Sequence, residues 1–129
     1  MQRSERFERG AARLAEMGGD IEDIVAPLAD VAPDLATYVG EFAFGDLYTR
    51  PGLDLRQRQL VTIAALVTLG DTERQLRFHT KAALNVGVTP SEIVETVIHL
   101  LAFAGNPRVF NAMLTVKGVF AERGLLPVG

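Results

Sequence analysis

The stretch LRFHTKAALNVGVTPSEI, residues 76–93, carries the strongest structural signals in the chain. Small and apolar residues recur with helical spacing until Gly87, a residue type that commonly ends a helix. Thr89 and Glu92 then have the spacing of a capping box, in which two side chains satisfy free backbone N–H groups at the start of the next helix. The stretch therefore predicts two helices joined by a short turn, with His79 on the first of them.

Similar signals divide the rest of the chain, and no alternation of apolar and polar residues competes with the helical spacing. Asp54 with Gln57 and Thr72 with Gln75 are two further predicted capping boxes. The predicted helices begin at or just after Ser4, Asp20, Pro33, Asp54, Thr72, Thr89 and Asn106. The sequence therefore predicts an all-α fold, a compact bundle of about seven helices that forms one domain over residues 1–129.

Two of the predicted helices have apolar faces that we expect to lie in the core. The fourth helix carries Leu60, Val61, Ile63, Ala64 and Val67 on one side. The sixth carries Ile93, Val97, Leu100, Leu101 and Ala104.

The composition limits the classes of function. A length of 129 residues with 48% hydrophobic and 22% charged residues is typical of one folded domain. The net charge of -3 argues against a nucleic-acid partner, which would favour clustered Lys and Arg. No apolar run is long enough to span a membrane and the charged N-terminus does not resemble a signal peptide, so we expect a cytoplasmic protein. The absence of cysteine excludes thiolate catalysis and thiolate metal sites.

His79 is the first candidate for chemistry. It shares a helix side with Leu76, Ala83 and Val86, so its ring is expected to be at least half buried. One interpretation is a core histidine that makes a single hydrogen bond. The other is a histidine in a small pocket, where it exchanges a proton with a bound substrate.

His99 lies on the more polar side of its helix, four residues after Glu95. An exposed ion pair within the helix is the simpler interpretation, and a polar contact in a substrate site is the alternative. The two histidines lie on different predicted helices and have no metal-ligand spacing, so no metal site is expected.

Arg50, Arg56 and Arg58 form the one local concentration of positive charge, around the turn PGLD. They are either solvated or include one arginine that binds a carboxylate through two parallel hydrogen bonds. Phe44 and Tyr48 are the aromatic residues that we expect to form the wall of a pocket.

Read together, EFAFGDLYTRPGLDLRQRQLVTIAALVTLG and LRFHTKAALNVGVTPSEIVETVIHLLAFAGNPRVFNAM resemble the carboxymuconolactone decarboxylase family. The resemblance is strong over residues 41–120. The superfamily also includes alkylhydroperoxidase-type proteins, which use a Cys-x-x-Cys motif shortly before the histidine that His79 resembles. Thr72 and Gln75 stand at about those places, and Gln59 stands where that branch carries an acid. Peroxide reduction needs a thiolate, so the decarboxylase branch remains.

The family's named reaction converts 4-carboxymuconolactone into 3-oxoadipate enol-lactone and CO2 in protocatechuate breakdown. The resemblance implies a decarboxylase without a cofactor, because the substrate's own conjugated carbonyl accepts the electrons. It implies His79 as proton donor or oxyanion stabiliser, Arg50 or Arg58 as carboxylate anchor, and His99 as a second polar contact. Phe44 and Tyr48 would complete the wall.

The resemblance also implies a homo-oligomer, a trimer or a hexamer. The bulky Val109 and Phe110 stand where the family often has small residues, which leaves the substrate open. One alternative is a cofactor-free lyase, cyclase or isomerase that acts on another lactone or a polyketide-like acid. The other is a non-catalytic oligomer that binds a ligand.

Overall fold

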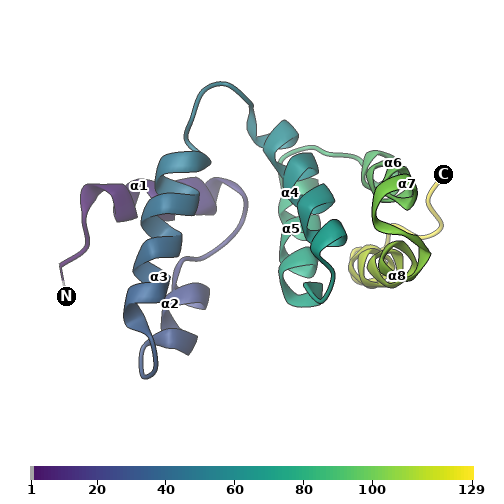
Figure 1. Cartoon of the computed structure of the whole chain (residues 1–129). Coiled ribbons are helices and arrows are strands. Elements are labelled where there is room, and N and C mark those ends of the chain that lie inside the picture. Colours follow the sequence, from purple (N-terminus) through teal and green to yellow (C-terminus); the bar gives the residue numbers. More distant parts are fainter. Residues whose placement is uncertain (1) are drawn as a thin grey trace. The chain divides into compact units, whose positions relative to one another are not determined.

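The computed structural model describes residues 2–129, and every regular element in that range is a helix (Figure 1). The elements are α1 (Glu5–Glu16), α2 (Glu22–Leu28), α3 (Pro33–Tyr38), η1 (Val39–Leu47), α4 (Leu55–Leu69), α5 (Glu73–Asn85), α6 (Pro90–His99), α7 (Leu101–Ala104) and α8 (Asn106–Glu122). The helix η1 continues α3, and a single residue separates α6 from α7, so the described chain contains seven helical segments. The predicted all-α fold is confirmed.

The chain divides into two compact units, one that ends at Leu55 and one of Arg56–Gly129. In the first unit, α1 packs along η1 (Figure 1). The predicted N-cap Ser4 is confirmed, because its hydroxyl accepts a hydrogen bond from the backbone N–H of Phe7 at 3.1 Å. Arg6 reinforces the helix contact through an ion pair with Asp46, at 2.6 Å.

Glycines bring α1 and η1 into backbone contact. A Cβ atom on Gly10 would lie 2.0 Å from the carbonyl oxygen of Gly40 and 2.9 Å from the backbone nitrogen of Gly45. The helix η1 is a π-helix, with hydrogen bonds between residues five apart. In an α-helix Gly40 and Gly45 would point about 140° apart, because each residue turns the chain by about 100°. The wider π turn brings these two glycines closer to the side that faces α1.

Replacing Gly10 with alanine is expected to destabilise the protein by about 3 kcal/mol, the upper end of the range for overpacked cores. The added methyl group would meet backbone atoms, which cannot rotate away. This cost exceeds the roughly 0.5–1 kcal/mol that alanine normally gains over glycine within a helix. Urea unfolding would measure the difference. Gly52→Ala is the matched control, since no atom lies within 4 Å of its added Cβ, and an equal loss in both variants would contradict the packing explanation.

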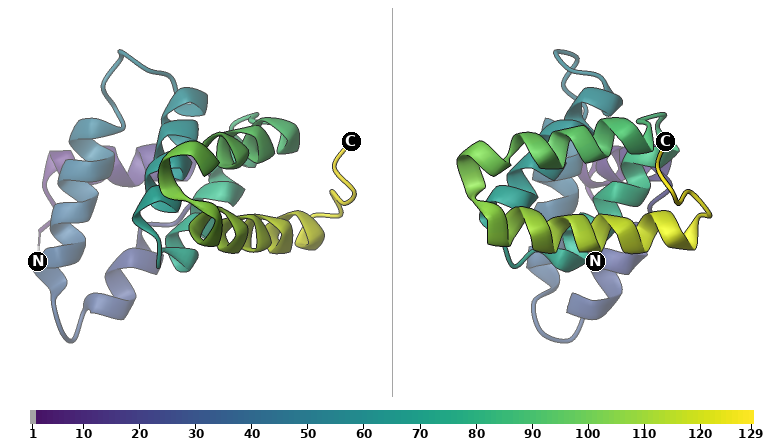
Figure 2. Two further views of the ribbon diagram at one scale, coloured as in Figure 1. Left: turned by 45° about the vertical axis from the view of Figure 1, so that its right-hand side comes forward. Right: turned by 90° about the vertical axis from the view of Figure 1, so that its right-hand side faces the viewer.

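In the second unit, a hydrophobic core joins α4, α5, α6 and α8. The rods α6–α7 and α8 run beside each other, as the right view of Figure 2 shows. The centre of this core consists of fully buried side chains: Ile63, Ile93, Val97, Val116 and Phe120. Two residues expected in this core are not there, since Val61 is 59% exposed and Leu101 is 51% exposed. Val61 lies at the edge of its apolar stripe, and Leu101 begins α7, where the chain turns between α6 and α8.

The predicted helix starts of the second unit have different outcomes. The capping box of Thr89 and Glu92 is confirmed, with both reciprocal hydrogen bonds present. The predicted capping box of Thr72 is wrong, because its hydroxyl donates instead to the carbonyl oxygen of Leu66 at 2.7 Å. Thr72 thus ties the start of α5 to the end of α4. In the first unit, Asp20 accepts from the backbone N–H of Glu22, but Ile21 occupies the N-cap position of α2.

Over residues 2–129, no helix has both the length and the apolar character that crossing a bilayer requires.

Candidate functional site

His79 is held by a buried partner on the neighbouring helix. Its Nδ1 atom lies 2.9 Å from Oε1 of Gln59, which joins α5 to α4. The side chain of Gln59 is fully buried, whereas that of His79 is partly buried. The expected burial of His79 is confirmed. The ring is thus fixed on one side and is neither sealed in the core nor free in solvent.

Burial also sets the charge of His79. Desolvation lowers the pKa of the imidazole from 6.5 to about 4, because the charged form loses hydration. At neutral pH the ring is therefore uncharged in the ligand-free protein. A carboxylate bound nearby would raise this pKa again, since an opposite charge favours the protonated ring.

Arg56, at the start of α4, has a structural partner within the second unit. Nη2 of Arg56 lies 2.7 Å from both carboxylate oxygens of Glu92. Backbone hydrogen bonding at Thr89 and the guanidinium of Arg56 together lower the pKa of Glu92. Glu92 thus completes the start of α6 and ties it to α4. Arg58 is partly buried, and its Nε atom is fully buried.

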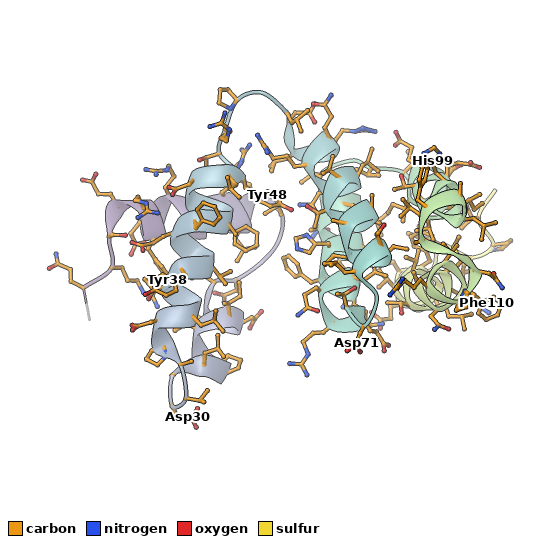
Figure 3. All side chains as sticks on the ribbon, viewed as in Figure 1. Asp30, Tyr38, Tyr48, Asp71, His99 and Phe110 are labelled. Atoms are coloured by element: carbon orange, nitrogen blue, oxygen red, sulfur yellow. The ribbon has the colours of Figure 1, made fainter. Side chains whose placement is uncertain are left out.

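The predicted site residues of the first unit lie in the last part of η1 and just after it. Phe44 is buried, and its ring lies 5.2 Å from that of Tyr48, centroid to centroid, at an angle of 38°. The carbonyl oxygen of Tyr48, which Figure 3 labels, accepts a hydrogen bond from Nε of Arg13 at 2.9 Å. Arg50 is exposed two residues later. The structure therefore brings Phe44 and Tyr48 together, as a pocket wall requires.

His99 occupies different surroundings from His79. It is the last residue of α6 and is exposed (Figure 3). The centroid of its ring lies 5.6 Å from that of Phe103. It lines an open depression of about 540 Å³ with Ala64 of α4 and Glu95 of its own helix. Its role as a substrate contact stays a prediction.

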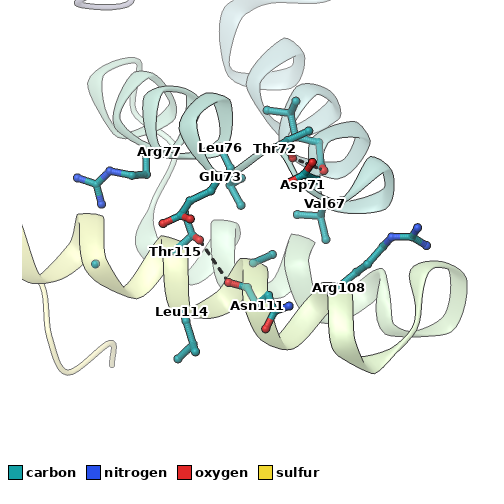
Figure 4. Close-up of a pocket in the computed structure, with 14 residues that line it drawn as sticks. Val67, Asp71, Thr72, Glu73, Leu76, Arg77, Arg108, Asn111, Leu114 and Thr115 are labelled. Atoms are coloured by element: carbon teal, nitrogen blue, oxygen red, sulfur yellow. Dashed lines mark hydrogen bonds between the residues drawn. The ribbon is translucent and has the colours of Figure 1, made fainter.

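A larger pocket of about 740 Å³ lies between the α4–α5 turn and α8 (Figure 4). Its lining includes the apolar Val67 and Leu76 and the charged Asp71, Glu73 and Arg108. None of the predicted site residues lines this pocket, and it contains no histidine. Size alone therefore does not make it the catalytic site. Within residues 2–129, no three His, Asp or Glu side chains are grouped so that they could hold a metal ion.

Gln59 is the residue whose role at the site the sequence reasoning missed. In the sequence, Gln59 stands out only because the alkylhydroperoxidase-type branch carries an acid at this position. The available signal was its position, since Gln59, Ile63 and Val67 are spaced four apart on the buried side of α4. A polar side chain at a core position needs a hydrogen-bond partner, and here that partner is His79.

Comparison with known proteins identifies the family of this chain. The sequence profile of the carboxymuconolactone decarboxylase family matches residues 33–117, which include Gln59 and every predicted site residue. The chain is 35% identical to the 4-carboxymuconolactone decarboxylase of Acinetobacter baylyi, over 98% of this chain and 96% of that protein. It is 37% identical to the nitrosuccinic acid decarboxylase npaB of Metarhizium robertsii, over 61% of this chain and 54% of that protein. It is also 36% identical to an uncharacterized 15.0 kDa protein of Paracoccus denitrificans, over 71% of this chain and 69% of that protein. With a profile that matches most of the chain and a relative that aligns nearly from end to end, this protein belongs to the carboxymuconolactone decarboxylase family.

Proposed function

We propose that this protein is a carboxy-lyase that converts 4-carboxymuconolactone into 3-oxoadipate enol-lactone and CO2. The observation that carries the proposal is the similarity to the Acinetobacter baylyi decarboxylase, which covers almost the whole of both chains. The half-buried His79, hydrogen-bonded at Nδ1 and uncharged in the ligand-free protein, supports it. The cytoplasmic location expected from the sequence stays a prediction.

The substrate supplies the electron sink for this reaction. The departing carboxylate is attached to a carbon that is conjugated through the ring alkene to the lactone carbonyl. The electron pair of the broken C–C bond moves into that system and forms a dienolate, and a proton then adds to ring carbon. The protein has to hold the carboxylates, stabilise the oxyanion and deliver the proton. None of these steps requires a cofactor.

In this proposal His79 supplies the proton. Binding of the anionic substrate raises the pKa of the ring, which takes up one proton from solvent and becomes an imidazolium. After CO2 leaves, the imidazolium gives that proton to ring carbon and returns to the neutral form. Charge and protons balance, because one carboxylate and one proton become CO2 and a new C–H bond.

The other predicted residues bind the substrate. Arg58 or Arg50 is the carboxylate anchor, and the guanidinium of Arg56 binds Glu92. His99 provides a further polar contact, and the paired rings of Phe44 and Tyr48 form an apolar wall.

Replacing Arg58 with alanine is expected to lower kcat/KM for the lactone by about 10- to 100-fold, the value of one charged hydrogen-bonding group. The measurement is the loss of the lactone's ultraviolet absorbance, together with CO2 release. Lys117→Ala is the control, since it removes an exposed cation from α8. Wild-type turnover in the Arg58 variant would transfer the anchoring role to Arg50, which Arg50→Ala tests in the same assay. Absence of any turnover by the wild-type protein would refute the proposed reaction.

The similarity to a nitrosuccinic acid decarboxylase favours a second candidate, a decarboxylase that acts on a different carboxylic acid. Another lactone or a polyketide-like acid is such a substrate, and a lyase, cyclase or isomerase reaction would follow. Product analysis with a panel of these acids separates the candidates. A non-catalytic binding protein would instead show saturable affinity for the lactone without product.

We also propose that the protein forms a homo-oligomer, a trimer or a hexamer. Large apolar side chains are exposed on both units, which is typical of surfaces that bind protein. They include Tyr38, Phe42, Phe103, Phe110 and Leu114. Light scattering of the purified protein would measure the oligomeric state, and a monomer at micromolar concentration would contradict this proposal.

A further inference from the structure

We propose that Gln59 is a positioning residue that decides which nitrogen of His79 carries the ring proton. In this assignment the amide of Gln59 holds the proton on Nδ1 and presents Nε2 to the substrate. The catalytic consequence rests on the proposed function, whereas the proton position is a property of the free protein.

The direction of the hydrogen bond follows from the amide oxygen of Gln59 facing the ring. Oε1 of Gln59 lies 2.9 Å from Nδ1 of His79. A carbonyl oxygen only accepts hydrogen bonds, so Nδ1 must donate. A neutral imidazole carries one N–H, and the lone pair therefore lies on Nε2. Nε2 is then the atom that can take up a proton and pass it to a substrate.

Complete burial makes Gln59 a firm support. Its side chain is 0% exposed and shares the inner side of α4 with Ile63 and Val67, which are 0% and 2% exposed. Packing on this side restricts the rotamers of the amide, and a buried amide without its hydrogen bonds would be costly. The hydrogen bond to His79 therefore orients the ring of a side chain that is itself only partly buried.

The chemical type of the residue supports a role in catalysis. A carboxylate at this position would also accept from Nδ1, but its charge would favour the imidazolium form before any substrate arrived. An apolar residue would fill the core without orienting the ring. An amide provides orientation without charge. It leaves His79 neutral in the empty site and lets the substrate's own carboxylate trigger protonation at Nε2.

Nitrogen NMR of the full chain tests the proton position directly. The chain has two histidines, so in the His99→Asn variant every histidine signal comes from His79. In protein labelled with [15N]histidine at neutral pH, we expect His79 to give the pattern of a neutral ring protonated at Nδ1. A ring protonated at Nε2 in the wild-type protein would overturn the assignment.

Two substitutions at Gln59 test its influence on the ring. In Gln59→Leu the acceptor is lost, and we expect the Nδ1–H pattern to be lost and kcat to fall by about 10- to 100-fold, part of the 10²–10⁴-fold effect of a positioned acid–base group. In Gln59→Glu we expect Nδ1 to stay protonated and the ring to show the imidazolium pattern at neutral pH. Gln57→Glu is the control, because it adds the same charge at an exposed position of α4. Its NMR pattern and kcat should match the wild type.

The NMR and kinetic results separate the two proposals. An unchanged His79 pattern in Gln59→Leu, or wild-type turnover despite a changed pattern, would refute the positioning role. If the wild-type ring is protonated at Nδ1 and Gln59→Leu changes it, but the wild-type protein does not release CO2 from the lactone, the proton assignment stands and the proposed reaction fails. Circular dichroism spectra of each variant verify that it is folded.

Discussion

His79→Ala is expected to lower kcat for 4-carboxymuconolactone by about 10²- to 10⁴-fold, the contribution typical of a positioned acid–base group. The variant removes the side chain that hydrogen-bonds to Gln59 and the proposed source of the proton that adds to ring carbon. KM should change less, since the arginines bind the carboxylates in this mechanism. Initial rates of absorbance loss over a range of lactone concentrations separate the two constants.

Two controls accompany this experiment. The alanine variant leaves space beside Gln59, so added imidazole should restore part of the lost rate if a ring nitrogen supplies the proton. His99→Ala should have a smaller effect, because in this mechanism the exposed His99 contacts the substrate and does not supply the proton. Turnover near the wild-type value in His79→Ala would remove His79 from the mechanism.

The burial of His79 also predicts how stability depends on pH. The folded-state pKa is about 4 and the unfolded value is 6.5, so the unfolded chain binds the proton more strongly between these values. The contribution of this residue to stability is therefore complete above pH 6.5 and is lost as the pH falls towards 4. The shift corresponds to about 3 kcal/mol of unfolding free energy. Urea unfolding of the wild type at pH 7 and at pH 4 should show this loss.

Comparison with His79→Gln isolates the contribution of this one group. Carboxylates with lowered pKa values, such as those of Asp46 and Glu122, also destabilise the fold in acid, but they are the same in both proteins. The difference in stability between variant and wild type should therefore change by about 3 kcal/mol over the window. Parallel curves for His79→Gln and the wild type would show that the ring is not desolvated as the structure indicates.

Features that depend on neighbouring residues could be predicted from the sequence. The Ser4 cap and the Thr89–Glu92 capping box were predicted and are confirmed, because each involves groups three residues apart. The helical spacing correctly placed Ile63 and Val97 in the core. The partly buried position of His79 followed from the same spacing.

The local sequence pattern did not predict hydrogen bonds and burial correctly where a side chain has several possible environments. Thr72 has the spacing of a capping residue, but it bonds to Leu66, six residues earlier, because the turn brings that carbonyl within reach. Val61 belongs to an apolar stripe but is exposed, since the stripe is wider than the face that α4 buries. The backbone contact between α1 and η1 brings Gly10 against Gly40 and Gly45, which lie 30 and 35 residues later in the chain.

By itself, the sequence determined that the protein is helical, that it has no thiol chemistry, that His79 lies on a half-buried helix face, and that the chain resembles its family. Only the tertiary structure decided that Gln59 binds His79 and that Arg56 is committed to Glu92. The physical reason is distance along the chain. These partners are 20 and 36 residues apart, and their meeting depends on how α4 lies against α5 and α6 rather than on the conformation of either segment.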